Sequence, residues 1–424
     1  MYMCLEGCKQ SFLRCRRFIG LDGCFLKGYY GGMILAAVGR DPNDQMLPIA
    51  IAVAEGETKD SWLWFLKLLI ADLGGKDFCQ TITFMSDQQK GLLPAIDELL
   101  PNVEQRFCVR HFYSNFRKRY SGKALKDLMW KAAKASYHQE WEKTMREIRS
   151  INPEAHKYLM RTPPRHWSKS WFRFDSKCDV LVNNMSETFN SVILGPREKP
   201  IVTMFEEIRC YLMERWARNR SKMIELEAGA VLPNIKKKLL KERERSRFWM
   251  CRVSGYMLFE VYNRNQTSEQ YTVNLDAQTC SCRRWMLSGI PCCHAITCYM
   301  DRKLDPDDYI PHFYRKEAYV SCYEPLIHPT NGQNLWETTP YPDILPPPMR
   351  KMPGRPKKSR NKGTYEKAKG ANEKAKDPSL VTRKGKANNC IICKQVGHNK
   401  RSCKSNANTS QGETSSQAAT QSGP

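Results

Sequence analysis

The sequence predicts a mixed α/β (α+β) domain, followed by small cysteine-rich modules and a basic, polar tail. Between residues 17 and 109, short apolar runs bounded by glycine or turn residues alternate with runs of helical period. This pattern is typical of strands and helices packed in layers. Cysteine and histidine gather at two places after residue 279, and beyond residue 331 the apolar content is too low to build a core.

Five strands are expected in the α/β domain, at residues 17–22, 31–38, 47–54, 81–87 and 103–109. The first three suit an antiparallel meander, because Asp41-Pro-Asn-Asp44 is a strong turn signal between the second and the third. Asp60 or Ser61 is expected to cap a helix that Gly74-Gly75 ends. A short helix is expected between the last two strands.

The bulk composition restricts the partners of the chain. Its 424 residues include 68 Lys plus Arg against 44 Asp plus Glu, a formal charge of +24. This excess favours a polyanionic partner such as nucleic acid. No apolar run is long enough to span a membrane, and the N-terminus lacks a signal-peptide pattern. The 18 cysteines are therefore expected as reduced thiols and zinc ligands of an intracellular protein.

Three acidic residues are candidates for a catalytic site. Asp22 and Asp87 each stand at the end of an expected strand, and Glu187 stands in an expected helix that Asn184 or Ser186 starts. Two strand aspartates and a helix glutamate suit a site for two Mg²⁺ or Mn²⁺ ions that cleaves or transfers a nucleic-acid strand, because hard cations take oxygen ligands. Each aspartate alone also has a structural interpretation, as the end of a strand or the cap of a helix.

Seven runs around these acids are distinctive. They are Gly20-Leu-Asp22-Gly-Cys-Phe-Leu-Lys-Gly, Gly31-Gly-Met-Ile-Leu-Ala-Ala-Val, Pro48-Ile-Ala-Ile-Ala-Val-Ala-Glu55, Trp62-Leu-Trp-Phe-Leu, Ser86-Asp87-Gln-Gln-Lys-Gly91-Leu, Cys108-Val-Arg-His111 and Asn184-Met-Ser-Glu187-Thr-Phe-Asn190. Together they resemble the Mutator-like (MuDR-type) plant transposases. The resemblance implies a ribonuclease-H-like core interrupted by a helical insertion, with Asp22, Asp87 and Glu187 as its metal-binding acids.

The segment after the fifth strand leaves two alternatives open. Cys108-x2-His111 has the spacing of two metal ligands but cannot complete a tetrahedral zinc site alone, so a structural or site-supporting role is favoured. Residues 114–199 are basic and aromatic, with Trp167, Trp171 and Phe172 among Arg and Lys. They suit either a DNA-binding surface or a solvated face over buried tryptophans.

Four residues with the spacing of zinc ligands follow a hairpin expected over residues 256–276. They are Cys280, Cys282, Cys292 and His294. Three thiolates and one imidazole complete a closed tetrahedral site, so this zinc is expected to be structural. The pattern resembles the SWIM-type zinc finger. Cys293 and Cys298 are expected to be packed thiols.

The C-terminal part contains two further candidate modules. Gly354-Arg355-Pro, flanked by basic residues, resembles an AT-hook whose Arg355 enters the minor groove of DNA, although a nuclear-import signal or a plain linker fits as well. The second module has the spacing of a CCHC zinc knuckle, which binds single-stranded nucleic acid. Its zinc ligands are Cys390, Cys393, His398 and Cys403.

Seven segments are therefore expected along the chain. They are an N-terminal remnant, disordered or packed (1–16), the core (17–113), the helical insertion with the helix of the third acid (114–250), the SWIM-type region (251–330), a Pro/Lys-rich linker (331–389), the knuckle (390–403) and a disordered tail (404–424). Within the third segment, a helix over residues 200–219 is expected to start with a Thr203–Glu206 capping box and to pack an apolar stripe on the core.

The resemblance implies a nuclear DNA transposase with two structural zinc sites. The partners it implies are DNA, as transposon ends and target, and single-stranded nucleic acid through the knuckle; self-association stays open. A domesticated or inactive transposase that regulates transcription by binding DNA without cutting it is the main alternative. An RNA-binding zinc-knuckle protein is a third interpretation.

Overall fold

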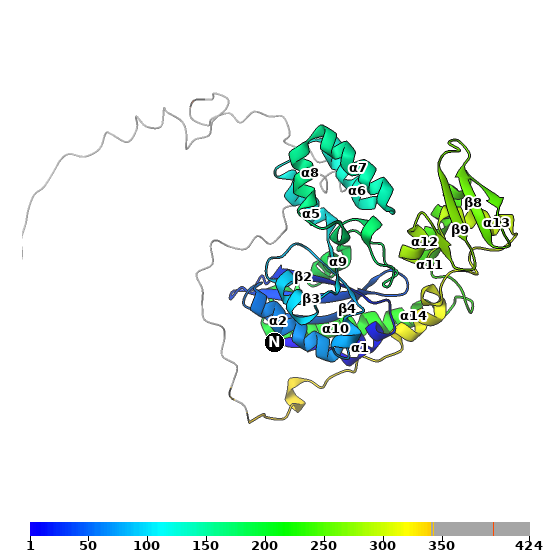
Figure 1. Ribbon diagram of the computed structural model, residues 1–424. Helices are drawn as coiled ribbons and strands as arrows, with labels where there is room; N and C mark the ends of the chain where they lie inside the picture. Colours follow the sequence, from blue (N-terminus) through cyan, green and yellow to red (C-terminus); the bar gives the residue numbers. More distant parts are fainter. Residues whose placement is uncertain (341, 343–392, 394–424) are drawn as a thin grey trace, which may run out of the picture. The chain divides into compact units, whose positions relative to one another are not determined.

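The structure is a computed structural model that describes residues 1–340, 342 and 393 (Figure 1). Arg355 and the expected zinc knuckle at 390–403 fall outside the described residues, apart from Cys393. The described part is a mixed α/β structure with two sheets. No helix in it is both long and apolar enough to cross a membrane.

The larger sheet has six strands in the order β1-β4-β3-β2-β5-β6. They are β1 (Tyr2–Cys4), β2 (Phe18–Phe25), β3 (Met33–Arg40), β4 (Met46–Ala54), β5 (Thr83–Ser86) and β6 (Glu104–Phe107). The antiparallel β2-β3-β4 meander is present as expected, and β5 and β6 extend it in parallel beside β2. Residues 1–16 are packed rather than disordered, since β1 pairs with β4 and a helix follows it.

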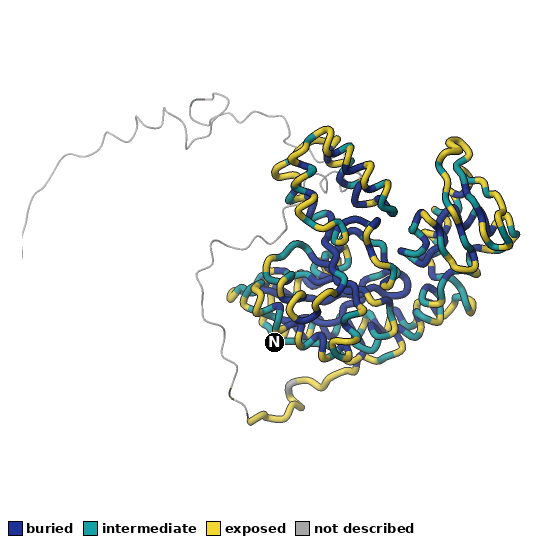
Figure 2. The backbone as a smooth tube through the Cα atoms, in the orientation of Figure 1, coloured by how far each residue is buried: buried dark blue, intermediate teal, exposed yellow. Residues whose placement is uncertain are grey.

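Within residues 1–340, seven helices pack around this sheet. They are α1 (Glu6–Leu13), α2 (Lys59–Asp72), α3 (Lys76–Cys79), α4 (Leu92–Leu99), α9 (Asn184–Val192), α10 (Ile201–Lys222) and α14 (Lys316–Tyr323). The central strands are buried almost throughout (Figure 2). The apolar stripe of α10, which includes Ile208, Leu212 and Trp216, joins the same core, as the sequence predicts.

Two predicted helix caps are wrong. Thr58, and neither Asp60 nor Ser61, caps α2, because its side chain accepts a hydrogen bond from the Ser61 N–H group. The predicted capping box of α10 is absent because the helix already starts at Ile201, directly after Pro200. Thr203 therefore lies inside the first turn, where it cannot serve as the cap.

The insertion after β6 has an apolar core of its own. It contains α5 (Val109–Arg117), α6 (Lys123–Lys134), α7 (His138–Ile151) and α8 (Pro153–Met160), followed by the short 3₁₀ turns η1 (Pro164–His166) and η2 (Lys169–Trp171). Trp167 and Phe172 are buried in this core, whereas Trp171 is 40% exposed. Of the two alternatives for the aromatic residues, buried packing therefore describes Trp167 and Phe172.

The smaller sheet has the strand order β10-β9-β8-β7 and is antiparallel throughout. Its strands are β7 (Trp249–Val253), β8 (Leu258–Asn263), β9 (Gln270–Asn274) and β10 (Thr279–Cys280), and the helices around it are α11 (Pro233–Ser246), α12 (Arg284–Ser288) and α13 (Cys293–Asp301). The expected hairpin is the β8–β9 pair. Strand β7 and the two-residue β10 were not predicted from the sequence.

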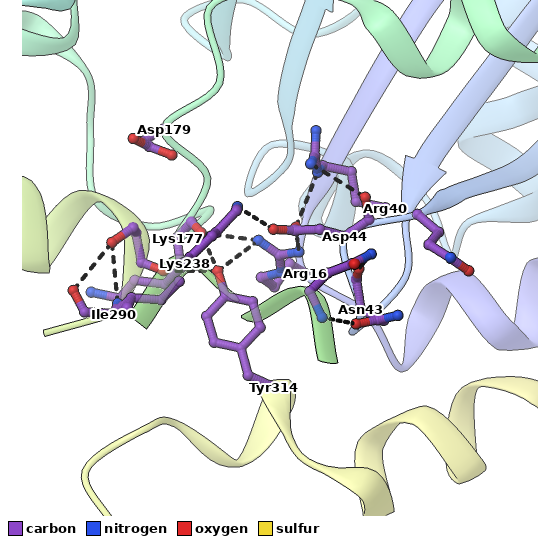
Figure 3. A network of polar contacts seen from close by, with 12 residues as sticks. Arg16, Arg40, Asn43, Asp44, Lys177, Asp179, Lys238, Ile290 and Tyr314 are labelled. Carbon is purple, nitrogen blue, oxygen red and sulfur yellow. Dashed lines mark hydrogen bonds and ion pairs between the residues drawn. The ribbon is translucent and has the colours of Figure 1, made fainter. Parts of the chain in front are cut away.

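The turn between β3 and β4 fastens distant parts of the chain to the main sheet. Asp44, buried in this turn, forms ion pairs with Arg16, Arg40 and Lys238 of α11 (Figure 3). The 3₁₀ turn η4 (His312–Tyr314) approaches the same network, because the Tyr314 hydroxyl accepts a hydrogen bond from Arg16 at 2.9 Å (Figure 3). The turn thus joins the N-terminal segment, the sheet and the region that follows the insertion.

Candidate active site and metal centre

Asp22 and Asp87 lie on neighbouring strands. Asp22 stands inside β2, which continues to Phe25 and does not end at residue 22 as expected, and Asp87 directly follows β5. Strands β2 and β5 are parallel, and Gly20 pairs with Met85. Each aspartate stands two residues beyond its member of this pair, so both project to the same face of the sheet. Burial raises the pKa of Asp22 to about 7, and the negative charge of Asp87 adds to this rise.

The carboxylate oxygens of these aspartates differ in whether they accept a hydrogen bond. Asp22 Oδ1 accepts a hydrogen bond from the Gly23 N–H group at 3.1 Å, and Asp22 Oδ2 accepts one from Asn190 Nδ2 at 2.7 Å. Asp87 Oδ1 is buried and has no hydrogen-bond partner among the described residues. Burial raises the pKa of Asp87, against an opposing effect of the nearby His111. A buried carboxylate without a donor is expected to attract a cation.

Helix α9 brings Glu187 close to the two aspartates because β2 has a glycine beneath the start of the helix. A Cβ atom on Gly20 would lie 2.2 Å from Asn183 Oδ1 and 2.9 Å from Ser186 Oγ, so any larger residue would displace these two side chains at the start of the helix. Asn183 Nδ2 also donates to the Leu21 carbonyl at 3.0 Å. Glu187 follows one turn later, and Asn190, three residues further on the same face, reaches Asp22.

Glu187 forms an ion pair with a basic residue of the insertion. One of its oxygens forms an ion pair with Arg110 of α5, and the other is buried without a partner in the described part of the chain. Its charge contributes to the raised pKa of Asp22. The three acids do not form a ligand group as tight as the Cys/His cluster described below.

Cys108 and His111 lie beside the acids. The Cys108 N–H group donates to the Ser86 carbonyl at 2.7 Å, which joins the start of α5 to the strand that precedes Asp87. Interaction with the Cys108 thiol raises the pKa of His111 to about 9, burial opposes this rise, and the charges of Asp87 and Glu187 support it. A protonated His111 next to these carboxylates fits the site-supporting role that the sequence predicts.

The four expected zinc ligands meet in one buried cluster. Their ligand atoms all lie within 4.8 Å of one another, and this is the one such group in the described part of the chain. Cys280 lies on β10, Cys282 follows it, Cys292 precedes α13 and His294 belongs to the first turn of that helix. Because all four donors come from the protein, the cluster fits a closed structural zinc site.

The surroundings of this cluster fix the imidazole and keep the other cysteines away. The His294 ring stacks on Tyr271 with centroids 4.2 Å apart, and Nδ1 lies 3.4 Å from Cys280 Sγ. Cys293 instead accepts a hydrogen bond from Arg284 at 3.1 Å. Cys298 is buried outside the cluster. The two spare thiols are therefore packed, as the sequence predicts.

Three residues at the candidate active site were not identified from the sequence. Asn190 had a signal, because it stands three residues after Glu187 on one helix face. Arg110 stands inside the Cys108-x2-His111 motif but resembles any exposed basic residue of an amphipathic helix. Glu57 lies in the loop between β4 and α2, and only packing between distant segments brings it beside Asp22.

Comparison with known protein families adds two findings to this geometry. Residues 18–115 match the MULE transposase domain, and residues 271–297 match the SWIM zinc finger. The first range contains Asp22 and Asp87, and the second contains all four residues of the Cys/His cluster. No curated protein matches the chain.

The two matches, together with the acids on the α/β sheet and the separate Cys/His cluster, support a transposase-family protein that carries a zinc finger. More particularly, the combination of a MULE transposase domain with a SWIM zinc finger matches a Mutator-like transposase. Glu187 lies beyond the matched transposase range, so its assignment depends on the contacts of α9.

Proposed function

We propose that this chain is a Mutator-like DNA transposase that cleaves phosphodiester bonds and transfers DNA strands with the help of divalent metal ions. The observation that carries the proposal is the placement of Asp22 and Asp87 at matching positions of two parallel neighbouring strands, within the matched transposase domain. The strand order β4-β3-β2-β5-β6 is the order expected of a ribonuclease-H-like core.

Asp22, Asp87 and Glu187 are the residues that would hold two Mg²⁺ or Mn²⁺ ions. Their hard oxygen atoms suit these cations, and two of the oxygens, on Asp87 and Glu187, are buried without a partner among the described residues. Bound there, the ions would stabilise the negative charge that develops on the phosphate and promote attack by water or a DNA 3′-hydroxyl.

The protein itself contributes orientation and charge. Two hydrogen bonds orient the carboxylate of Asp22. Asn190 donates to one of its oxygens, and the Gly23 N–H group donates to the other. His111 carries a raised pKa of about 9 and is protonated at neutral pH, so it offsets part of the negative charge of Asp87 and Glu187. Arg110 neutralises Glu187 directly.

The proposed partners follow from charge and from the motifs. The formal charge of +24 favours DNA as substrate and target, and the proposed zinc knuckle would add contacts with single-stranded nucleic acid. The SWIM cluster would hold one structural Zn²⁺ and the knuckle a second. A DNA substrate also implies a nuclear location.

A transposase-derived regulator that binds DNA without cutting it is the second candidate. The pairing of Glu187 with Arg110 favours it, because the third acid is then neutralised by the protein.

The decisive experiment is a nicking assay on labelled duplex DNA with added Mn²⁺. Asp87→Asn removes the charge of a candidate ligand, and Glu98→Gln removes an exposed charge on α4 that pairs with Lys59. We expect nicking by the wild type and by Glu98→Gln, and none by Asp87→Asn. Binding of DNA by all three proteins without any nicking would replace the transposase proposal by the regulator.

A further inference from the structure

The loop between β4 and α2 places a fourth carboxylate against the strand of Asp22. If Gly23 carried a Cβ atom, this atom would lie 2.8 Å from both Glu57 Cδ and Glu57 Oε1 and 3.1 Å from Glu57 Oε2. The carboxylate of Glu57 therefore occupies the space that a side chain at position 23 would fill. Residue 23 directly follows Asp22, and the charge of Glu57 acts on Asp22, so the two acids are neighbours along β2.

The segment that follows Asp87 holds the same loop from its other side. A Cβ atom on Gly91 would lie 2.7 Å from the Thr58 carbonyl carbon and 2.8 Å from the Lys59 nitrogen. Gln89 accepts a hydrogen bond from the Gly91 N–H group at 2.7 Å, and its amide approaches the Glu57 carbonyl at 3.5 Å. Two glycines thus allow the loop to sit between the Asp22 strand and the Asp87 segment.

The electrostatic interactions of Glu57 agree with this placement. Its pKa is raised first by burial and then by the charge of Asp87, while the groups that oppose the rise, Gln89 and Trp62, are neutral. Glu57 in turn contributes to the raised pKa of Asp22. Glu57 therefore lies near the carboxylates of Asp22 and Asp87, and no cation is among the groups that act on it. This concentration of negative charge costs free energy unless a cation from solution binds there.

We propose that Glu57 is a fourth carboxylate of the metal site, contacting a divalent cation together with Asp22 and Asp87. This inference rests on the proposed function, since it assigns a further ligand to the same site. Gly23 and Gly91 act through it as positioning residues. Gly23 leaves room for the carboxylate, and Gly91 lets the loop approach.

Mn²⁺ binding to the zinc-loaded full chain tests the proposal without requiring DNA cleavage. We expect Glu57→Gln to weaken Mn²⁺ binding, measured by isothermal titration and by the spin-resonance signal of free Mn²⁺, by about ten-fold or more. Asp60→Asn, which removes one exposed charge three residues away, is the matched control and should bind Mn²⁺ as the wild type does.

Gly23→Ala supplies a second variant that keeps the carboxyl group but fills its place. The added Cβ displaces the end of a flexible side chain, so the fold should survive and Mn²⁺ binding should weaken to a similar degree. If both changes act through one carboxylate, the double variant Gly23→Ala/Glu57→Gln should be no weaker than Glu57→Gln alone.

The outcomes separate this inference from the proposed function. If Asp87→Asn abolishes Mn²⁺ binding while Glu57→Gln binds as tightly as the wild type, Glu57 is not a ligand and the three-acid site stands. If the zinc-loaded wild type binds no Mn²⁺, or Asp87→Asn leaves binding intact, both proposals are overturned. Weakening by Glu57→Gln and Gly23→Ala, with Asp60→Asn unchanged, supports the assignment.

Discussion

Replacing Asp44 by asparagine should cost about 3–5 kcal/mol of the free energy of unfolding. The Asp44 side chain is 6% exposed, as is that of Arg16, and Arg40 is 9% exposed. Asparagine keeps the shape and tolerates the left-handed backbone of this position, where φ is 59°. The substitution therefore removes little besides the charge and leaves two buried guanidinium groups unpaired, for which a cost of about 3–5 kcal/mol is typical.

Lys238→Gln is the matched control, because it removes a partner of the same carboxylate at the surface. The Lys238 side chain is 44% exposed, so solvent screens its ion pair and its loss should cost at most about 1 kcal/mol. Urea denaturation of the zinc-loaded protein, followed by tryptophan fluorescence, measures both variants. A loss below about 1 kcal/mol for Asp44→Asn would show that the network is not a structural hub.

The pH dependence gives the same prediction an independent check. Burial acts to raise the pKa of Asp44, but Arg16, Arg40 and Lys238 outweigh it and hold that pKa well below its usual range. A depressed folded-state pKa means that the stabilisation is present above the unfolded pKa of about 3.9 and is lost as the pH falls below it. The wild type should therefore begin to lose its advantage over Asp44→Asn below about pH 4 and continue to lose it as the pH falls toward the depressed folded-state pKa.

Four further predictions concern the two candidate sites. Gly20→Ala should place a Cβ atom against Asn183 at the start of α9 and break the hydrogen bond from Asn183 to the Leu21 carbonyl. This loss should lower the free energy of unfolding by about 1–3 kcal/mol in urea denaturation and reduce nicking. Unchanged stability would contradict the close packing. Cys292→Ser should lower the zinc content by one ion per chain and reduce the melting temperature, whereas unchanged metal analysis would exclude it as a ligand. Because the pKa of Asp22 is raised to about 7, protons should compete with Mn²⁺ and calorimetry should show weaker binding at pH 6 than at pH 8. For the same reason the metal-free fold should lose stability as the pH rises from about 4 to 7, and pH-independent binding and stability would refute the raised pKa. Arg110→Gln should tighten Mn²⁺ binding, because it removes the ion pair that occupies Glu187. If binding tightens equally in a Glu187→Gln background, Glu187 is not the group through which Arg110 acts.

The features that could be predicted from the sequence depend on short-range patterns. The β2-β3-β4 meander follows from apolar runs separated by a strong turn signal, and the Cys/His cluster follows from the local spacing of its ligands. The predicted cap of α2, Asp60 or Ser61, lies after the true cap in the sequence. The reason is that Lys59 and Asp60 are exposed and do not contribute to the apolar period by which the helix was recognised. Thr58, which precedes them, is the residue with the free side-chain acceptor.

The features that could not be predicted depend on contacts between distant segments. Strand β1 has three residues and no alternation to detect, and it exists because β4 offers an open edge. The sequence predicts only a turn at Asp44, but Arg16 and Lys238, which bind its carboxylate, lie 28 and 194 residues away in the chain. Glu57 likewise becomes part of the candidate site only because Gly23 and Gly91 let its loop approach two strands.

The charges at the candidate active site give a physical reason to expect divalent cations there. Four carboxylates and two cationic groups meet around β2 and the end of β5, which leaves two negative charges without a counter-charge when all are ionised. The acids are Asp22, Glu57, Asp87 and Glu187, and the cations are Arg110 and His111. Burial and this repulsion together raise the pKa of Asp22, so a proton takes the place of a cation near neutral pH. A divalent ion that displaces this proton would keep every acid ionised, so the same carboxylates that burden the metal-free fold are the ones that would bind the metal most tightly.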